Sequence, residues 1–140
     1  MGCCTPARRS VVIEVTVLRV EGETCERCNG TVDAVRDAAG QLEKALAPLG
    51  VDVSLVEHAA TMDNLVDSNS VVVNGKPIEE WIGAERVSTE CVSCGDLCGE
   101  SVGCGAVAVG DTVQESYTVE QVRDAVFAAM SAQPAGGCCG

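Results

Sequence analysis

The stretch Thr24-Cys25-Glu26-Arg27-Cys28-Asn29-Gly30 places two cysteines two residues apart. It lies between a β-branched run, Val11 to Val20, that predicts a strand and an apolar-periodic run, Thr31 to Leu49, that predicts a helix with Thr31 as its N-cap. The amide end of a helix favours negative charge and lowers the pKa of a nearby thiol. The stretch therefore predicts a reactive or ion-binding thiol pair at a strand-to-helix junction.

Further apolar patterns predict an α/β domain organised around that junction. The first run is nearly continuous in β-branched residues, as expected of a central strand buried on most of both faces. Val51 to Leu55 alternates apolar and polar residues, so strand, crossover helix and strand form a parallel βαβ unit. Val71 to Val73 predicts a third strand, which the Asn74-Gly75 turn ends.

The last third of the chain predicts an insertion followed by the closing elements. From Cys91 to Gly105 the composition changes to Cys, Gly and Ser, which predicts a loop. Ala106 to Val109 and Thr112 to Tyr117 predict a hairpin or a broken last strand, and Thr118-x-x-Gln121 fits a capping box that begins the final helix. A C-x-x-C pair beside a βαβ pattern is typical of the thioredoxin-like layout. The predicted fold is therefore a central mixed sheet, βαβ then ββα, with a cysteine-rich insertion.

These patterns divide the chain into three parts. Residues 1–10 and 133–140 are expected to be a flexible leader and a flexible tail, each with one adjacent cysteine pair, and residues 11–132 form the domain. The leader lacks the apolar segment of a signal peptide, and no apolar run approaches the length of a membrane span. We therefore expect a cytoplasmic protein.

The charge of the chain excludes several classes of partner. It has 9 Lys and Arg residues against 21 Asp and Glu residues, a net charge of −12. This balance argues against a nucleic acid or an anionic membrane and favours a cationic ligand. No P-loop, dinucleotide fingerprint or Ser/His/Asp set is present, so no organic cofactor is expected.

The cysteine content indicates metal or redox chemistry. The chain has 10 cysteines, and a reducing compartment disfavours structural disulfides. As a redox pair, Cys25 is the more exposed nucleophile and Cys28 resolves the mixed disulfide. As a metal pair, both thiolates hold one soft ion such as Hg(II), Cu(I), Zn(II) or As(III). A pair of inert buried thiols is the third alternative.

Four further cysteines lie in the insertion, at Cys91, Cys94, Cys98 and Cys104. Their spacing lets several thiolates reach one ion from a tight turn. The open alternatives are a structural Cys4 zinc site, a soft-metal or relay site shared with Cys25 and Cys28, and an iron–sulfur cluster.

The two ends carry the adjacent pairs Cys3-Cys4 and Cys138-Cys139. Adjacent cysteines close only a strained disulfide ring, so they are better suited as thiols or ion ligands. A tethered dithiol can capture an ion and pass it to a second site by ligand exchange. Tails of no consequence are the alternative, and both a monomer and a metal-bridged dimer stay open. His58, the single histidine, is expected at the surface.

Three stretches resemble the DUF2703 family of bacterial thioredoxin-like proteins: Gly22 to Cys28 (GETCERC), Ser68 to Trp81 (SNSVVVNGKPIEEW) and Cys91 to Gly95 (CVSCG). The resemblance covers Val11 to Met130 and implies a thioredoxin-like fold without a settled activity. In thioredoxins a cis-proline faces the C-x-x-C pair. The matching position here is Asn69, which leaves the site freer to bind a metal ion.

Two shorter resemblances concern metal transfer. Gly137-Cys138-Cys139-Gly140 is similar to the C-terminal pair with which mercuric reductases collect Hg(II), and Thr24 to Cys28 is similar to a metallochaperone loop. We expect a protein that binds a soft metal or metalloid through Cys25 and Cys28 and sequesters or delivers it, first of all mercury or arsenic. A metal-transfer or thiol-redox protein is the expected partner. The alternatives are a thiol–disulfide oxidoreductase with Cys25 and Cys28 as catalytic residues, and a zinc-stabilised adaptor.

Overall fold

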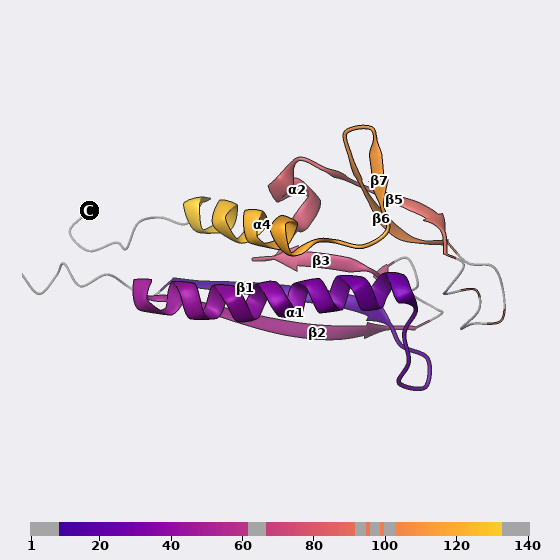
Figure 1. Ribbon diagram of the computed structural model, residues 1–140, viewed down its shortest axis with the longest axis horizontal. Coiled ribbons are helices and arrows are strands. Elements are labelled where there is room, and N and C mark those ends of the chain that lie inside the picture. The colour runs from indigo at the N-terminus through magenta and orange to yellow at the C-terminus, as the bar shows by residue number, and fades with distance from the viewer. Residues whose placement is uncertain (1–8, 62–66, 92–94, 96–98, 100–102, 133–140) are drawn as a thin grey trace, which may run out of the picture.

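The computed structural model describes residues 9–61, 67–91, 95, 99 and 103–132 (Figure 1). The described elements follow in the order β1 (Arg9–Leu18), α1 (Glu26–Leu46), η2 (Ala47–Leu49), β2 (Val51–Ala60), β3 (Ser70–Val73), β4 (Lys76–Pro77), α2 (Ile78–Ile82), β5 (Glu85–Glu90), β6 (Gly103–Val109), β7 (Thr112–Gln114) and α4 (Val119–Ala132). The sequence from Thr61 to Val66 predicts a short helix or turn, but residues 62–66 lie outside the described residues. None of the described helices has the length and apolarity needed to cross a membrane.

The central sheet of the described chain has four strands in the order β2-β1-β3-β4. Strands β1 and β2 are parallel, from Arg9 opposite Val51 to Leu18 opposite Ala60, and α1 connects them. Strand β3 runs antiparallel to β1, and β4 follows β3 through the Asn74-Gly75 turn. The predicted βαβ unit, mixed sheet and α/β class are confirmed.

Strand β1 is central but has only one fully covered face. Its residues alternate between buried and partly exposed, and the buried set is Val11, Ile13, Val15 and Val17. Helices α1 and α4 pack on this strand and on each other. The prediction that most of both faces is buried therefore holds fully for one face, which the two helices cover, while the other face is only partly buried.

Helix α1 begins five residues before the predicted Thr31. Its N-cap is Cys25, whose sulfur accepts a hydrogen bond from the Cys28 amide at 3.5 Å. Thr31 lies inside the helix, where its hydroxyl donates to Asn69 Oδ1 and does not cap the helix N-terminus. Gly30 serves close packing, since a Cβ there would lie 2.7 Å from Ser116 Oγ. Both residues that had indicated a helix start are therefore used in tertiary contacts.

The predicted insertion contains more structure than a loop. Strands β5, β6 and β7 form a separate three-stranded antiparallel sheet among the described residues. The predicted hairpin is confirmed as β6 and β7, with Val109 opposite Thr112, but it pairs with β5 and not with the central sheet. The alternative prediction, that this segment forms the last strand of the central sheet, was wrong. The two-residue β4 occupies the edge of the central sheet next to β3. Figure 1 shows the second sheet at the end of the molecule where α1 begins.

The predicted capping box at the start of α4 is confirmed. Thr118 Oγ1 accepts from the Gln121 amide at 3.2 Å, and Gln121 Oε1 accepts from the Thr118 amide at 3.0 Å. We expect Thr118→Ala to lower the free energy of unfolding by about 1 kcal/mol. Ser131→Ala, at the exposed other end of α4, should change it by less than about 0.5 kcal/mol. Urea denaturation of the reduced protein measures both, and equal effects would contradict the assignment.

Candidate thiol site

Four cysteines from separate parts of the chain lie in one buried cluster. Cys25 is the N-cap of α1, Cys28 lies in its first turn, Cys91 follows β5, and Cys104 lies in β6. Their exposed fractions are 3%, 0%, 2% and 1%, and none of the four is in a disulfide bond. Cys25 is the more exposed of the C-x-x-C pair, as predicted, at 3% against 0% for Cys28. Both thiols are nevertheless buried, because strands β5 and β6 bring other residues over the start of α1.

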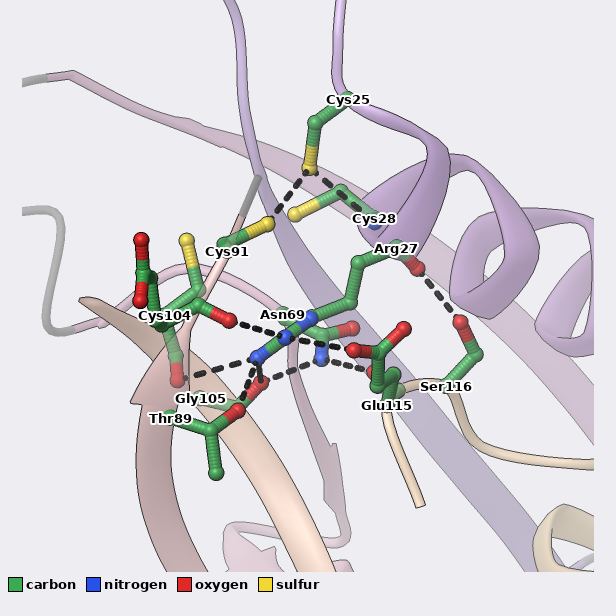
Figure 2. Close-up of polar contacts among 11 residues, drawn as sticks. Cys25, Arg27, Cys28, Asn69, Thr89, Cys91, Cys104, Gly105, Glu115 and Ser116 are labelled. Atoms are coloured by element: carbon green, nitrogen blue, oxygen red, sulfur yellow. Dashed lines mark hydrogen bonds and ion pairs between the residues drawn. The ribbon is translucent and has the colours of Figure 1, made fainter. Parts of the chain in front are cut away.

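The Cys25 sulfur is the centre of this cluster. It accepts a hydrogen bond from the Cys91 thiol, with the two sulfurs 3.9 Å apart, in addition to the Cys28 amide. In Figure 2 the sulfur atoms of Cys25, Cys28 and Cys91 point toward one another. Two donors and the amide end of a long helix stabilise negative charge on Cys25. The Cys25 sulfur therefore lies where a thiolate or an ion-bound sulfur would be stabilised.

The neighbouring thiols have the opposite effect on Cys28. Its hydrogen bond to Cys25 and its burial raise the pKa of the Cys28 thiol above the ordinary 9.0, and the nearby Cys25 and Cys104 raise it further. A hydrogen bond from the Leu18 backbone acts in the other direction but does not offset these causes. Cys28 therefore stays protonated at neutral pH unless an ion displaces the proton.

This raised pKa predicts a loss of stability in alkaline solution. Above pH 9.0 the unfolded chain has lost the Cys28 proton and the folded chain has kept it. The unfolded state then binds fewer protons, so the free energy of unfolding falls by up to about 1.4 kcal/mol per pH unit. Burial and Glu79 raise the pKa of Tyr117 above its ordinary 10.0, which acts in the same direction above that pH.

The measurement is urea denaturation of the reduced, ion-free protein at a series of pH values from neutral to alkaline. Cys28→Ala should flatten the decline that begins near pH 9 and leave the later contribution of Tyr117 in place. Identical pH profiles for the two proteins would show that Cys28 titrates normally in the folded state.

A family model described as "Domain of unknown function (DUF2703)" matches residues 11–126 of the chain. The chain belongs to the DUF2703 family. An "Uncharacterized protein" of Archaeoglobus fulgidus is 36% identical over 109 residues, which cover 75% of this chain and 77% of the relative. No solved structure matches the chain. The DUF2703 match includes all four buried cysteines, whereas Cys3-Cys4 and Cys138-Cys139 lie beyond its ends.

The other predicted ligands of this DUF2703 chain lie outside the described residues. They are Cys3, Cys4, Cys94, Cys98, Cys138 and Cys139. A zinc site formed by the insertion cysteines alone therefore stays a prediction. Within the described ranges, no three His, Cys, Asp or Glu side chains are already arranged around one point to hold a metal ion. His58 lies at the surface as predicted, with its Nε2 atom 3.0 Å from Glu14 Oε1.

Asn69, which the sequence comparison predicts to stand where thioredoxins have a cis-proline, lies buried beside the cluster. It is fully buried at φ +54, and the described chain contains no cis peptide bond. Its Nδ2 atom donates to the carbonyls of Gly105 and Glu115, each at 2.7 Å, while Oδ1 accepts from Thr31. One amide side chain thereby joins α1, β6 and the segment before α4. The sequence indicated only that proline is missing here.

The structure also gives Arg27 a role that the sequence did not reveal. In the sequence it only offsets the neighbouring carboxylates Glu23 and Glu26. In the structure its side chain is 2% exposed and donates to acceptors on β5, β6 and Glu115 (Figure 2). A basic residue between the two cysteines was the available signal, but its acceptors come from residues more than sixty positions away.

Proposed function

We propose that this protein binds a soft, thiophilic metal or metalloid ion through Cys25, Cys28, Cys91 and Cys104. The supporting observation is the 3.9 Å separation between the Cys25 and Cys91 sulfurs. In a tetrahedral thiolate site with metal–sulfur bonds of ~2.3 Å, two sulfur atoms lie about 3.8 Å apart. A disulfide would bring them to roughly 2.0 Å. The observed spacing thus fits two ligands of one ion.

Ion binding completes this arrangement by small side-chain movements. Cys28 and Cys104 belong to the same core cluster, and ion binding would require their side chains to turn toward the Cys25–Cys91 pair. Thiols must lose their protons to coordinate, so binding releases protons and strengthens as pH rises. Cys28 is protonated at neutral pH, so binding releases its proton there, and its raised pKa extends this pH dependence above pH 9.0. Four buried thiols and a net charge of −12 favour a cation over other ligands.

The fold that presents these thiols is, in our proposal, thioredoxin-like. The strand order β2-β1-β3-β4 with one parallel and two antiparallel pairs supports it, as does a C-x-x-C motif at the start of the helix after β1. Asn69 replaces the proline that would contact a substrate disulfide. This difference favours ion binding over disulfide exchange.

The terminal pairs would serve the same site as capture or hand-off arms. Cys3-Cys4 and Cys138-Cys139 are tethered dithiols, and tethering raises their effective concentration near the cluster. The similarity of Gly137 to Gly140 to the mercuric reductase ending supports Hg(II) as one cargo, and As(III) is the other soft ion we propose. The function would be sequestration or delivery in the cytoplasm, with a metal-transfer protein as partner.

One observation favours a second function, thiol–disulfide exchange by Cys25 and Cys28. Cys25 is a helix N-cap that accepts an amide hydrogen bond, an environment that activates thiolates in redox enzymes. The burial of both thiols opposes this function, because a protein disulfide must reach the attacking sulfur. Reduction of insulin in the presence of dithiothreitol tests it, and activity that requires both cysteines would favour the enzyme.

The test of the main proposal compares two double variants that each remove two thiols. Reduced protein is titrated anaerobically with Hg(II) or As(III) against a competing chelator. Cys25→Ser with Cys28→Ser should weaken binding at the high-affinity site by more than about 100-fold, because even outer-shell changes cost ~10–100-fold. Cys138→Ser with Cys139→Ser should leave that affinity within about 10-fold. Unchanged affinity and stoichiometry in the first variant would reject the proposal.

A further inference from the structure

Arg27 stands between the two cysteines of the C-x-x-C motif, yet its guanidinium group contacts the inserted sheet. Its two terminal nitrogens donate to Thr89 Oγ1 at 2.8 Å, the Glu90 carbonyl at 2.9 Å, Glu115 Oε1 at 3.0 Å and the Cys104 and Gly105 carbonyls at 3.3 Å. Figure 2 shows these acceptors grouped around the end of the side chain. One residue of α1 therefore bonds to both strands of the β5–β6 pair.

The backbone acceptors of Arg27 lie at or next to Cys91 and Cys104 in the chain. Glu90 immediately precedes Cys91, and the Cys104 carbonyl belongs to the fourth thiol residue itself. Thr89 lies directly opposite Cys104 in the strand register. Arg27 in turn is flanked by Cys25 and Cys28 on the same helical turn. The guanidinium thus fixes the backbone positions of one cysteine pair relative to the other.

Only arginine can satisfy this set of acceptors. A planar guanidinium presents several donors in a fixed fork, whereas a lysine ammonium is a point charge with three donors on a flexible stem. Burial of a charge is costly unless it is paired and hydrogen-bonded, and here the carboxylate of Glu115 and four other oxygens bind the two terminal nitrogens. An apolar side chain would fill the space without the desolvation cost of a buried charge, so the presence of the charge indicates a positional role.

We propose that Arg27 is the positioning residue that assembles the four-thiol site and thereby sets how many thiolates an ion receives. This inference rests on the proposed ion-binding function. With the Arg27 contacts in place, Cys91 and Cys104 stay beside Cys25 and Cys28 in the core. An ion that requires tetrahedral thiolate coordination, such as Zn(II) or Cd(II), would then draw all four sulfurs together. Without the Arg27 contacts, the C-x-x-C pair remains as a two-thiolate site, which suffices for Hg(II) but not for a tetrahedral ion.

The experiment titrates the full-length, reduced protein with Cd(II) and separately with Hg(II). Arg27→Met should weaken Cd(II) binding by about 100-fold and Hg(II) binding by less than about 10-fold, since outer-shell changes cost ~10–100-fold in affinity. X-ray absorption of the Cd(II) complex should count fewer sulfurs than in the wild-type protein. Arg27→Lys should restore part of the Cd(II) affinity. Arg36→Met, which removes an exposed arginine of the same helix paired with Glu57, should change neither affinity.

The outcomes separate this inference from the proposed function. Wild-type protein that binds neither ion rejects both. The positioning role of Arg27 alone is rejected if the wild-type and Arg27→Met proteins bind Cd(II) with the same affinity and sulfur count. If Arg27→Met does not fold, Thr89→Val removes one side-chain acceptor and leaves every thiol and the arginine in place. It should then weaken Cd(II) more than Hg(II), and equal losses for the two ions would overturn the inference.

Discussion

Asn69→Gly is expected to lower the free energy of unfolding by about 3 kcal/mol or more, because each buried polar group left without a partner costs ~1–3 kcal/mol. The change removes the acceptor of the Thr31 hydroxyl, the Asn69 donor to the Glu115 carbonyl, and the shorter of two hydrogen bonds to the Gly105 carbonyl. Glycine adopts the φ of +54 without strain, so the loss reports the side-chain bonds and not the backbone conformation. Urea denaturation of reduced protein measures it.

Asn74→Gly is the matched control for this prediction. Asn74 also has a positive φ, +50, and its side chain makes one exposed hydrogen bond to the Val12 amide. The same chemical change there should cost less than about 1 kcal/mol. A loss at Asn69 no larger than the loss at Asn74 would show that the buried amide does not hold the helix and the two sheets together.

Cys91→Ser is expected to weaken binding of a tetrahedral thiophilic ion such as Cd(II) by more than about 100-fold, because it removes a ligand and not merely an outer-shell group. Cys25→Ser should have an effect of similar size, since the two sulfurs lie 3.9 Å apart and would share the ion. Cys94→Ser should have a smaller effect. Competition titration of the three anaerobic single variants measures the order.

The order of these effects separates the proposed site from its rival. A structural zinc site confined to the insertion requires Cys91→Ser and Cys94→Ser to be equally damaging and Cys25→Ser to be harmless. That result would place the ion in the insertion and leave the C-x-x-C pair without a ligand role. Serine is a suitable replacement because it keeps the size of the buried thiol side chain while removing the soft donor.

Local patterns were sufficient to predict the parts of the fold that depend on near neighbours. The alternation at Val51 to Leu55, the Asn74-Gly75 turn and the Thr118-x-x-Gln121 box all describe contacts within a few residues, and each is present in the structure. The start of α1 was misjudged for the opposite reason. Gly30 packs closely against Ser116 and Thr31 bonds to Asn69, and both of these contact residues lie far away in the chain. Neither residue therefore marks the start of the helix.

The second sheet could not be predicted from local patterns either, because it depends on pairing between distant strands. Strand β5 reads Glu-Arg-Val-Ser-Thr-Glu, a polar sequence without a buried face, and it forms because β6 pairs with it across the insertion. The candidate site was predicted as a list of thiols and not as an arrangement. Spacing alone could not show that Cys91 approaches Cys25, because that contact depends on how β5 and β6 dock against α1. The Arg27 contacts depend on the same docking.

The central claim is that Cys25, Cys28, Cys91 and Cys104 together hold one soft ion. The most direct test is a variant in which the other six cysteines, Cys3, Cys4, Cys94, Cys98, Cys138 and Cys139, are replaced by serine. The account predicts that this protein, reduced and anaerobic, binds one Cd(II) per chain and that X-ray absorption counts four sulfur neighbours. A folded variant that binds no Cd(II), or binds it through two sulfurs, would contradict the account.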